Sequence, residues 1–129
     1  MKRVTGIGGI FFKGKDQKKL SEWYAKHLGL KEDAEGQGVL LRWRDVENPE
    51  RVGMTVWSVF KEDTKYFEPS HAPFMINYRV DDLDALLEAL RAEGVQIDPK
   101  RENYDYGKFA WIIDPEGNRI ELWEPPKNE

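Results

Sequence analysis

The sequence predicts an α+β fold built from two similar βαβββ modules that share one domain. The first observation is that apolar residues alternate with a period of two, then of about 3.6, then of two again, and that this order occurs twice. The second is that landmarks recur at a nearly constant separation. Asp16 and Asp82, which begin the two predicted helices, lie 66 residues apart, and Gly29 and Gly94, which end them, lie 65 apart. A chain of 129 residues is long enough for both modules around a shared core.

The first module is predicted over about residues 1–62, and a polar, proline-bounded linker without a clear period over residues 61–73. The elements expected in this module are a strand over 7–13, a helix from Asp16 to Gly29, a turn over 33–38, and strands over 39–44 and 54–60. Asp16 is a good N-cap residue, and glycine is the commonest residue that ends a helix.

The second module is predicted over about residues 74–129. Its expected elements are a strand over 74–80, a helix from Asp82 to Gly94, an interrupted strand or loop over 95–97 and 102–106, a strand over 108–113, and a last strand that begins after Gly117. The interruption is expected because Pro99 lacks the N–H group that a central strand needs.

The last strand follows the turn residues Pro115 and Gly117. Its alternation places Ile120 and Leu122 on one face and puts on the other face Arg119, Glu121 and Trp123. Two interpretations stay open at this point. The strand could form one wall of a pocket with an acid at its centre, or it could be an amphipathic edge strand with a solvated glutamate.

Composition excludes several classes of function. The net charge is −4 and no long run of Lys or Arg occurs, so a nucleic-acid partner is not expected. The absence of cysteine excludes disulfides and thiolate metal sites and suits a reducing cytosol. No apolar run has the length of a signal-peptide core or a membrane span, so we expect a cytoplasmic protein. The 16 aromatic residues favour a packed core or an aromatic-lined cavity.

The duplicated layout and two motifs resemble the vicinal oxygen chelate superfamily, which includes glyoxalase I, extradiol dioxygenases and the fosfomycin and bleomycin resistance proteins. The motifs are the helix end WYAKHLGL at Trp23–Leu30 and the turn and strand DPEGNRIELWEP at Asp114–Pro125. The resemblance implies an open barrel formed by the two modules, a small organic molecule as the partner and a homodimer as the assembly.

Metal-using members of that superfamily supply ligands from four inward positions. The resemblance places these positions at Gly9, Trp57, Met75 and Glu121. Only Glu121 can bind a hard or borderline divalent ion, and a catalytic site needs about three protein ligands. No cofactor is therefore expected, and a divalent metal held by Glu121 with His71 recruited to it is kept as an alternative.

Trp57 and Met75, at positions where metal-using members have ligands, predict a mostly apolar and aromatic binding face with a few polar groups. The candidate ligand-binding residues are Phe11, Arg42, Trp57, Met75, Asn77, Arg79, Tyr104, Arg119 and Trp123, with Thr55 on the same face and Tyr106 beside the mouth. Glu121 is the candidate catalytic residue, because a desolvated carboxyl would have a raised pKa and could act as a general base. An arginine beside it would instead hold it ionised and could bind an anionic group.

The expected function is binding of a small organic molecule without a catalytic metal. One alternative is a metal-dependent lyase, transferase or dioxygenase of the glyoxalase type that uses Glu121. A second is a non-catalytic scaffold in which Trp57 and Met75 fill the cavity. Whether the chain is an enzyme stays open at this stage; if it is one, a glyoxalase-type lyase or related activity is expected.

Overall fold

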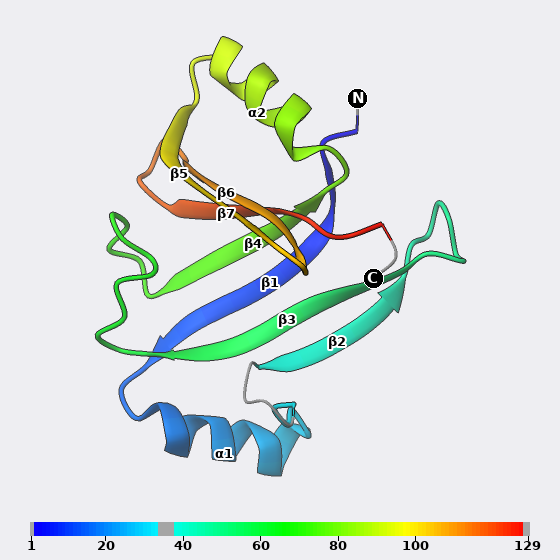
Figure 1. Ribbon diagram of the computed structural model, residues 1–129. Helices are drawn as coiled ribbons and strands as arrows, with labels where there is room; N and C mark the ends of the chain where they lie inside the picture. Colours follow the sequence, from blue (N-terminus) through cyan, green and yellow to red (C-terminus); the bar gives the residue numbers. More distant parts are fainter. Residues whose placement is uncertain (1, 34–37, 128–129) are drawn as a thin grey trace.

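The computed structural model describes residues 2–33 and 38–127 and contains one seven-stranded sheet and two helices (Figure 1). Its elements are β1 Val4–Gly14, α1 Gln17–Leu28, β2 Val39–Arg44, β3 Val52–Lys61, β4 Phe74–Val80, α2 Leu83–Ala92, β5 Gln96–Tyr104, β6 Gly107–Ile113 and β7 Arg119–Glu124. The strand order is β2-β3-β1-β4-β7-β6-β5. The predicted α+β class is therefore confirmed.

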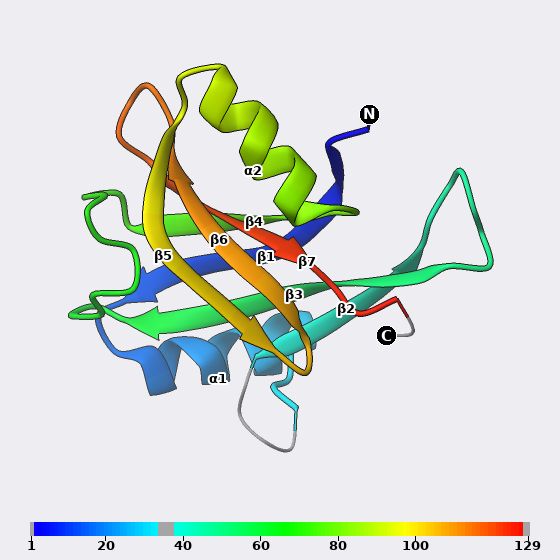
Figure 2. The same ribbon diagram turned by 45° about the horizontal axis from the view of Figure 1, so that its top comes forward.

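The two halves meet at the centre of the sheet, where β1 and β4 run antiparallel with Phe11 opposite Met75. Each of these first strands also pairs in parallel with the last strand of its own half, β1 with β3 and β4 with β7. Figures 1 and 2 show the sheet strongly curved, with α1 beside β3 and α2 beside β5 and β6 at opposite ends of the molecule.

The first half has one strand fewer than the βαβββ prediction within the part of the chain that the structure describes. The missing counterpart of β5 would fall between α1 and β2. Residues 34–37 of that segment, and with them most of the turn predicted over 33–38, lie outside the described residues.

Both helices begin after the predicted caps; α1 ends at Gly29 as predicted, and α2 ends at Ala92, two residues before Gly94. The Asp16 carboxylate accepts a hydrogen bond from the Lys19 amide at 3.1 Å, and Gly29 ends α1 with a φ of 70°. Asp82 accepts from the Ala85 amide at 3.0 Å in α2. A side chain that accepts from an amide of the first turn satisfies a donor that has no partner within the helix.

The helices cover the outer face of the sheet. Helix α2 buries Leu83, Leu86 and Leu87 in a cluster with Ala110 of β6 and Leu122 of β7. Helix α1 has no fully buried residue and packs on β1 and β3 through aromatic contacts. No described helix is long and apolar enough to cross a membrane.

Strand β5 corrects the prediction of an interrupted strand or loop. It is continuous over Gln96–Tyr104 and pairs with β6, with an irregular register between Ile97 and Arg101, where Pro99 lies. The strand lies at the edge of the sheet, where a residue without an N–H group is tolerated.

The inner face of the sheet has a separate core, and the predicted linker contributes to it. Phe67 of the linker is 0% exposed and packs with Phe11, Met75 and Trp111. The segment 61–73 is therefore part of the folded domain. The segment is polar overall, which led to the linker prediction, but its aromatic pair Tyr66 and Phe67 covers the inner face.

Candidate functional site

A buried carboxylate is the centre of the candidate site. Glu121 on β7 is 2% exposed and accepts three hydrogen bonds. Its donors are the Tyr66 hydroxyl, the Asn77 amide nitrogen at 2.6 Å and the Trp111 indole nitrogen at 3.0 Å. Strand register explains two of them, because β4 sets Asn77 beside Glu121 and β6 sets Trp111 opposite it. The third donor comes from the linker.

The environment raises the pKa of both acidic groups of the site, the Glu121 carboxyl and the Tyr66 hydroxyl. Burial raises the pKa of Glu121, against the opposing effects of its three hydrogen bonds and the nearby charge of Arg119. Burial also raises the pKa of Tyr66, and the negative charge of Glu121 adds to this effect. The Tyr66 hydroxyl is thus kept neutral and remains a hydrogen-bond donor to the carboxylate.

Arg119 fixes the linker over the site. The residue is 6% exposed, and its guanidinium donates to the Tyr66 carbonyl oxygen and to Asp98 at 3.3 Å. It also lies 5.9 Å from the Tyr66 ring centre and 4.9 Å from the Trp111 ring centre. These contacts position the Tyr66 hydroxyl on Glu121.

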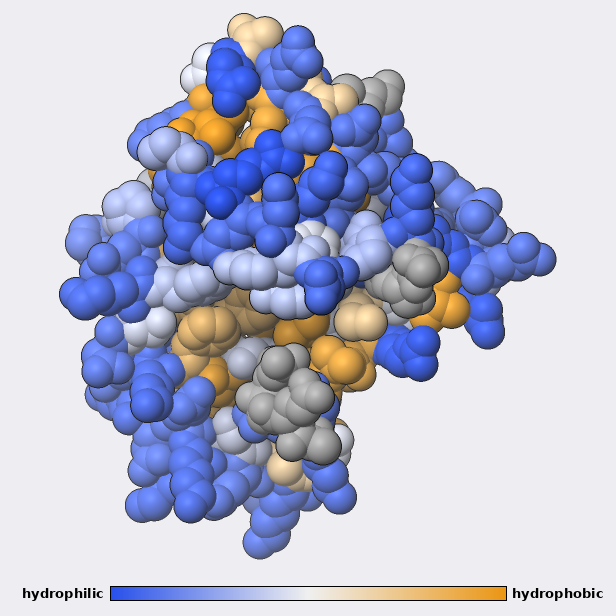
Figure 3. All heavy atoms as spheres, viewed as in Figure 1, coloured by the Kyte–Doolittle hydropathy of each residue, from blue (hydrophilic) through white to orange (hydrophobic). Residues whose placement is uncertain are grey.

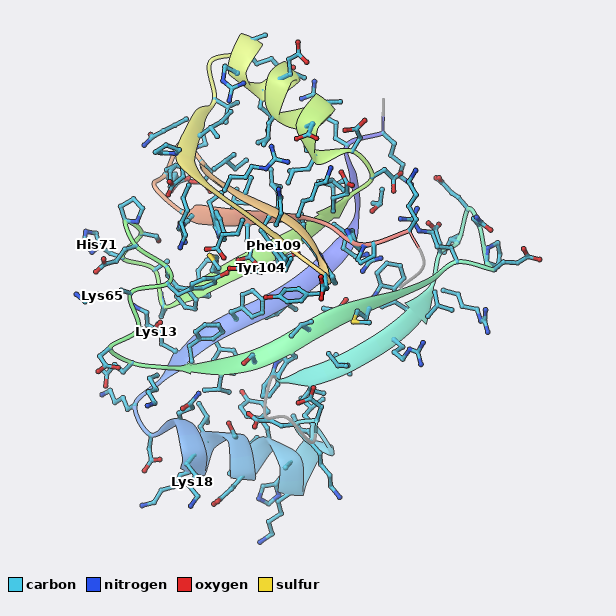
Figure 4. All side chains as sticks on the ribbon, viewed as in Figure 1. Lys13, Lys18, Lys65, His71, Tyr104 and Phe109 are labelled. Atoms are coloured by element: carbon cyan, nitrogen blue, oxygen red, sulfur yellow. The ribbon has the colours of Figure 1, made fainter. Side chains whose placement is uncertain are left out.

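A hollow of about 260 Å³ lies against two of the three donors of Glu121, and we call it the aromatic hollow. It is lined by Tyr66, Glu102, Tyr104, Tyr106, Phe109 and Trp111. Figure 4 shows Tyr104 and Phe109 close together where the β5–β6 hairpin crosses in front of β1 and β3. In Figure 3, apolar side chains gather in the recess below this hairpin.

The aromatic hollow differs from the larger hollows of the described structure. Those of about 460 to 580 Å³ lie beside α1 and near the C-terminal end, and charged or polar side chains form most of their walls. None of these three shares a wall with the Glu121 network, and neither does a hollow of about 310 Å³ beside β2, whereas the aromatic hollow does.

The residues present do not fit the metal centre that the resemblance implies. Glu121 already accepts from three neutral donors, which a cation would have to displace. Gly9 has no side chain and Met75 is packed at 0% exposure. No three His, Asp or Glu side chains come together within residues 2–33 and 38–127. His71 is exposed, and Figure 4 shows it on the outer side of the linker, away from Tyr104 and Phe109.

The predicted inward position of Trp57 is wrong. Trp57 contacts Tyr24 of α1, with ring centres 4.8 Å apart, and Phe12 at 5.4 Å, so it lies on the outer face of β3. The residue before it, Val56, packs on the inner core and pairs with Gly9. A strand alternates faces at every residue, so an error of one position reversed the assignment.

The other predicted apolar and charged residues lie in three different places. Phe11 and Met75 are core residues beneath Phe67. Arg42 is exposed on the edge strand β2, outside the hollow. Tyr104 lines the hollow directly, as does Tyr106, which was predicted beside the mouth, whereas Asn77 and Arg119 act on it through Glu121 and Tyr66.

Arg79 and Trp123 support the hairpin from behind. The buried Arg79 guanidinium lies between two indole rings, 5.2 Å from Trp43 and 5.0 Å from Trp123. Trp123 donates its indole N–H to the Tyr106 carbonyl at 2.8 Å and stacks on Phe109 with an angle of 5°. This series of contacts joins the first half of the sheet to the wall of the hollow.

Sequence reasoning missed the residues that form most of the hollow. Tyr66, Glu102, Phe109 and Trp111 were not among the predicted site residues, although all line it. The available signal was the aromatic pair at 66–67 in an otherwise polar segment, together with the alternation that sets Phe109 and Trp111 on one face of β6.

A family model described as "Glyoxalase/Bleomycin resistance protein/Dioxygenase superfamily" matches residues 6–122. A search of curated protein sequences finds no match. Among solved structures, methylmalonyl-CoA epimerase from Mycobacterium tuberculosis is 23% identical with a TM-score of 0.59, covering 99% of this chain and 93% of its own.

Methylmalonyl-CoA epimerase from Streptomyces coelicolor, in complex with 2-nitronate-propionyl-CoA, is 20% identical with a TM-score of 0.67, and 98% of each chain is covered. A structure described as NAD-dependent benzaldehyde dehydrogenase from Legionella pneumophila is 13% identical with a TM-score of 0.58, covering 92% of this chain and 98% of its own. At these identities the likeness establishes the fold and leaves the activity to the geometry of the site.

Proposed function

Because the chain belongs to the Glyoxalase/Bleomycin resistance protein/Dioxygenase superfamily, we propose that it binds a small organic molecule in the aromatic hollow without a catalytic metal. One observation carries the proposal. The buried Glu121 carboxylate is held by Tyr66 and Trp111, and both of these side chains form walls of the hollow.

The size and position of the hollow limit the ligand. Ligand sites commonly have volumes of about 300 to 1,000 Å³, so a hollow of about 260 Å³ suits a small molecule or one end of a larger one. The rest of the inner face is occupied by Phe11, Phe67 and Met75. Of the two residues that the scaffold alternative assigns to the cavity, Met75 lies in the inner core and Trp57 does not. The aromatic hollow beside this core supports binding over a filled scaffold.

Binding can be tested by thermal unfolding with a panel of small metabolites. A compound that binds the native state raises the midpoint, and Tyr104→Ala should abolish that rise because it removes a wall of the hollow. Trp23→Ala is the matched control, since Trp23 is an exposed aromatic residue of α1 outside the hollow. If no compound raises the midpoint, or if both variants lose the rise equally, the proposal fails.

A second candidate is an enzyme that moves a proton, which the raised pKa of Glu121 favours. Proteins of similar fold are described as epimerases, and inversion of a carbon beside a carbonyl requires removal and return of a proton. Glu121 would act as the base through Tyr66, which lines the hollow: the Tyr66 hydroxyl would give its proton to Glu121 while its oxygen takes the proton from the substrate carbon, and the reverse transfers would return a proton to that carbon. A Glu121→Gln variant should still bind the ligand but lose exchange of its hydrogen for solvent deuterium.

The metal-dependent alternative requires that Glu121 exchange its three donors for an ion. Elemental analysis of the purified protein distinguishes it from the first candidate. About one divalent ion per chain, lost in Glu121→Ala, would overturn binding without a metal.

We also propose a homodimer that pairs the outer faces of β1 and β4 from two copies, with the cytoplasm as its compartment. Between the helices these strands expose Ile7, Ile10 and Phe74 at 38%, 41% and 42%. Their antiparallel pairing makes this face nearly two-fold symmetric, which suits contact with a second copy. Ile10→Lys should convert a dimer to a monomer in light scattering, and a wild-type monomer would contradict the proposal.

A further inference from the structure

We propose that the ligand of the aromatic hollow is an organic cation, with an alkylated ammonium group as the part that enters. The inference rests on the proposed function and adds the chemical class of the ligand. Five of the six lining residues are aromatic, and the sixth is the carboxylate residue Glu102. Ring faces attract cations through their quadrupoles, and aromatic cages are a recurring way to bind alkylated ammonium groups.

The angles between the rings favour a compact group over a flat one. Phe109 is tilted by 59° to Tyr104 and by 66° to Tyr106, with centres 6.1 Å and 5.6 Å apart. Tyr66 and Trp111 meet edge to face at 88°. The one near-parallel pair of lining rings described, Tyr104 and Tyr106, is stacked face to face at 15° with centres 4.9 Å apart and leaves no gap for a flat aromatic ligand. The other rings present faces in several directions. Such a box suits a rounded, positively charged group.

The chain already places an ammonium group against this wall. Lys100 Nζ lies 5.3 Å from the Trp111 ring centre and 2.9 Å from Glu102 Oε1. Lys100 and Glu102 alternate with one residue between them on β5, so their side chains share a face. The ring and carboxylate that would hold a ligand cation thus already hold one from the protein, and Lys100 competes with the ligand for them.

The remaining charges near the hollow are balanced. Arg119, which also contacts Trp111 and Tyr66, is paired with Asp98 and lies near Glu121. Glu121 accepts hydrogen bonds from the Tyr66 hydroxyl and the Trp111 indole N–H. A donor bonded to an anion becomes richer in electrons, which increases the attraction of both rings for a cation. The buried carboxylate therefore favours a cation without touching it.

The test compares choline with its neutral tert-butyl isostere, in which carbon replaces the ammonium nitrogen, by calorimetric titration of the full chain. Choline should bind about tenfold more tightly or better, because only it gains from the rings and Glu102. Equal affinities would overturn the cation inference and leave the proposed function intact. Absence of choline binding would also overturn it, whereas failure of the proposed function is detected separately by the metabolite panel.

Two variants give effects of opposite sign. Glu102→Gln should weaken choline binding by about tenfold, and Lys100→Gln should strengthen it by a few fold because the internal competitor is removed. Glu93→Gln is the matched control, an exposed carboxylate whose partner is Arg3, and it should leave affinity unchanged. Unchanged affinity in both hollow variants, with normal unfolding midpoints, would contradict the inference.

Discussion

The two halves of the sheet share the parallel pairing of their first and last strands and differ in the chemistry of that pair. In each half the first strand pairs in parallel with the last, which sets Gly9 beside Val56 in the first half and Asn77 beside Glu121 in the second. The first pair has no polar side chain, whereas the Asn77 amide donates to Glu121 at 2.6 Å. Repetition of the fold thus does not bring repetition of the site.

The first half contributes space instead of polar groups. A Cβ atom on Gly8 would lie 2.2 Å from Asn77 Oδ1 and 2.9 Å from both Arg79 Cγ and the Trp123 ring. The bare backbone of β1 therefore lets side chains of β4 and β7 lie over it. The asymmetry of the two halves is what allows Asn77 to reach Glu121.

The largest expected effect comes from removing the carboxylate. Glu121→Ala would leave two buried donors and one half-buried donor without an acceptor and should lower the free energy of unfolding by about 3 kcal/mol or more. The matched change in the first half, Val56→Ala, removes only apolar contacts of a half-buried side chain and should lower it by about 1 kcal/mol. Equal losses in denaturant unfolding would remove the distinction between the halves.

A methyl group added at Gly8 in the first half should disturb Asn77 in the second half. Gly8→Ala should lower the free energy of unfolding by about 1 to 3 kcal/mol, because overpacking displaces Asn77 or the backbone of β1. The amide signals of Asn77 should move in an NMR spectrum of the variant. A fully stable protein with unchanged Asn77 signals would show that the space above Gly8 is not needed.

A smaller effect is expected from the linker. Tyr66→Phe removes one of the three donors of Glu121 and should lower the free energy of unfolding by about 1 kcal/mol. Tyr24→Phe is a control in the first half, because Tyr24 packs on Trp57 through its ring. A stability loss in Tyr24→Phe but not in Tyr66→Phe would contradict the role assigned to the Tyr66 hydroxyl.

The smallest expected effect is a pH dependence carried by Glu121. Its pKa is raised in the folded state, so the folded chain binds more protons than the unfolded chain between the ordinary glutamate range and the raised value. Its contribution should therefore decrease as pH rises through that interval and be constant above it. Glu121→Gln should remove this slope from a series of unfolding midpoints, and identical slopes in both proteins would contradict the assignment.

Local signals predicted the fold well. The caps Asp16 and Asp82 and the glycines that follow the helices gave the order of elements, because these features depend on neighbours in sequence. The missing strand of the first half was not predictable in the same way. Its segment was expected to be a turn, and the assumption of an exact repeat supplied a strand that the described residues do not contain.

The sequence predicted the residues at the centre of the site, but most of the residues that line the hollow were not predicted. Glu121 and Asn77 follow from alternation along single strands, and the structure places them together. The inward position predicted for Trp57 was wrong because alternation separates two faces of a strand but does not say which one is inside. The register of β1 is also irregular between Ile7 and Gly9. Tyr66 reaches the site because Arg119 and the inner core hold the linker in place. The linker has no periodic pattern from which these contacts could be predicted.

We propose that the second half of the sheet binds the ligand while the first half does not. The five tryptophans provide separate NMR signals from their indole N–H groups. When a binding compound is titrated into the protein, the signal of Trp111 in the hollow should shift most and that of Trp123 behind it less. Trp57, which packs on α1, should stay unchanged. A shift of Trp57 with Trp111 unmoved would contradict the account.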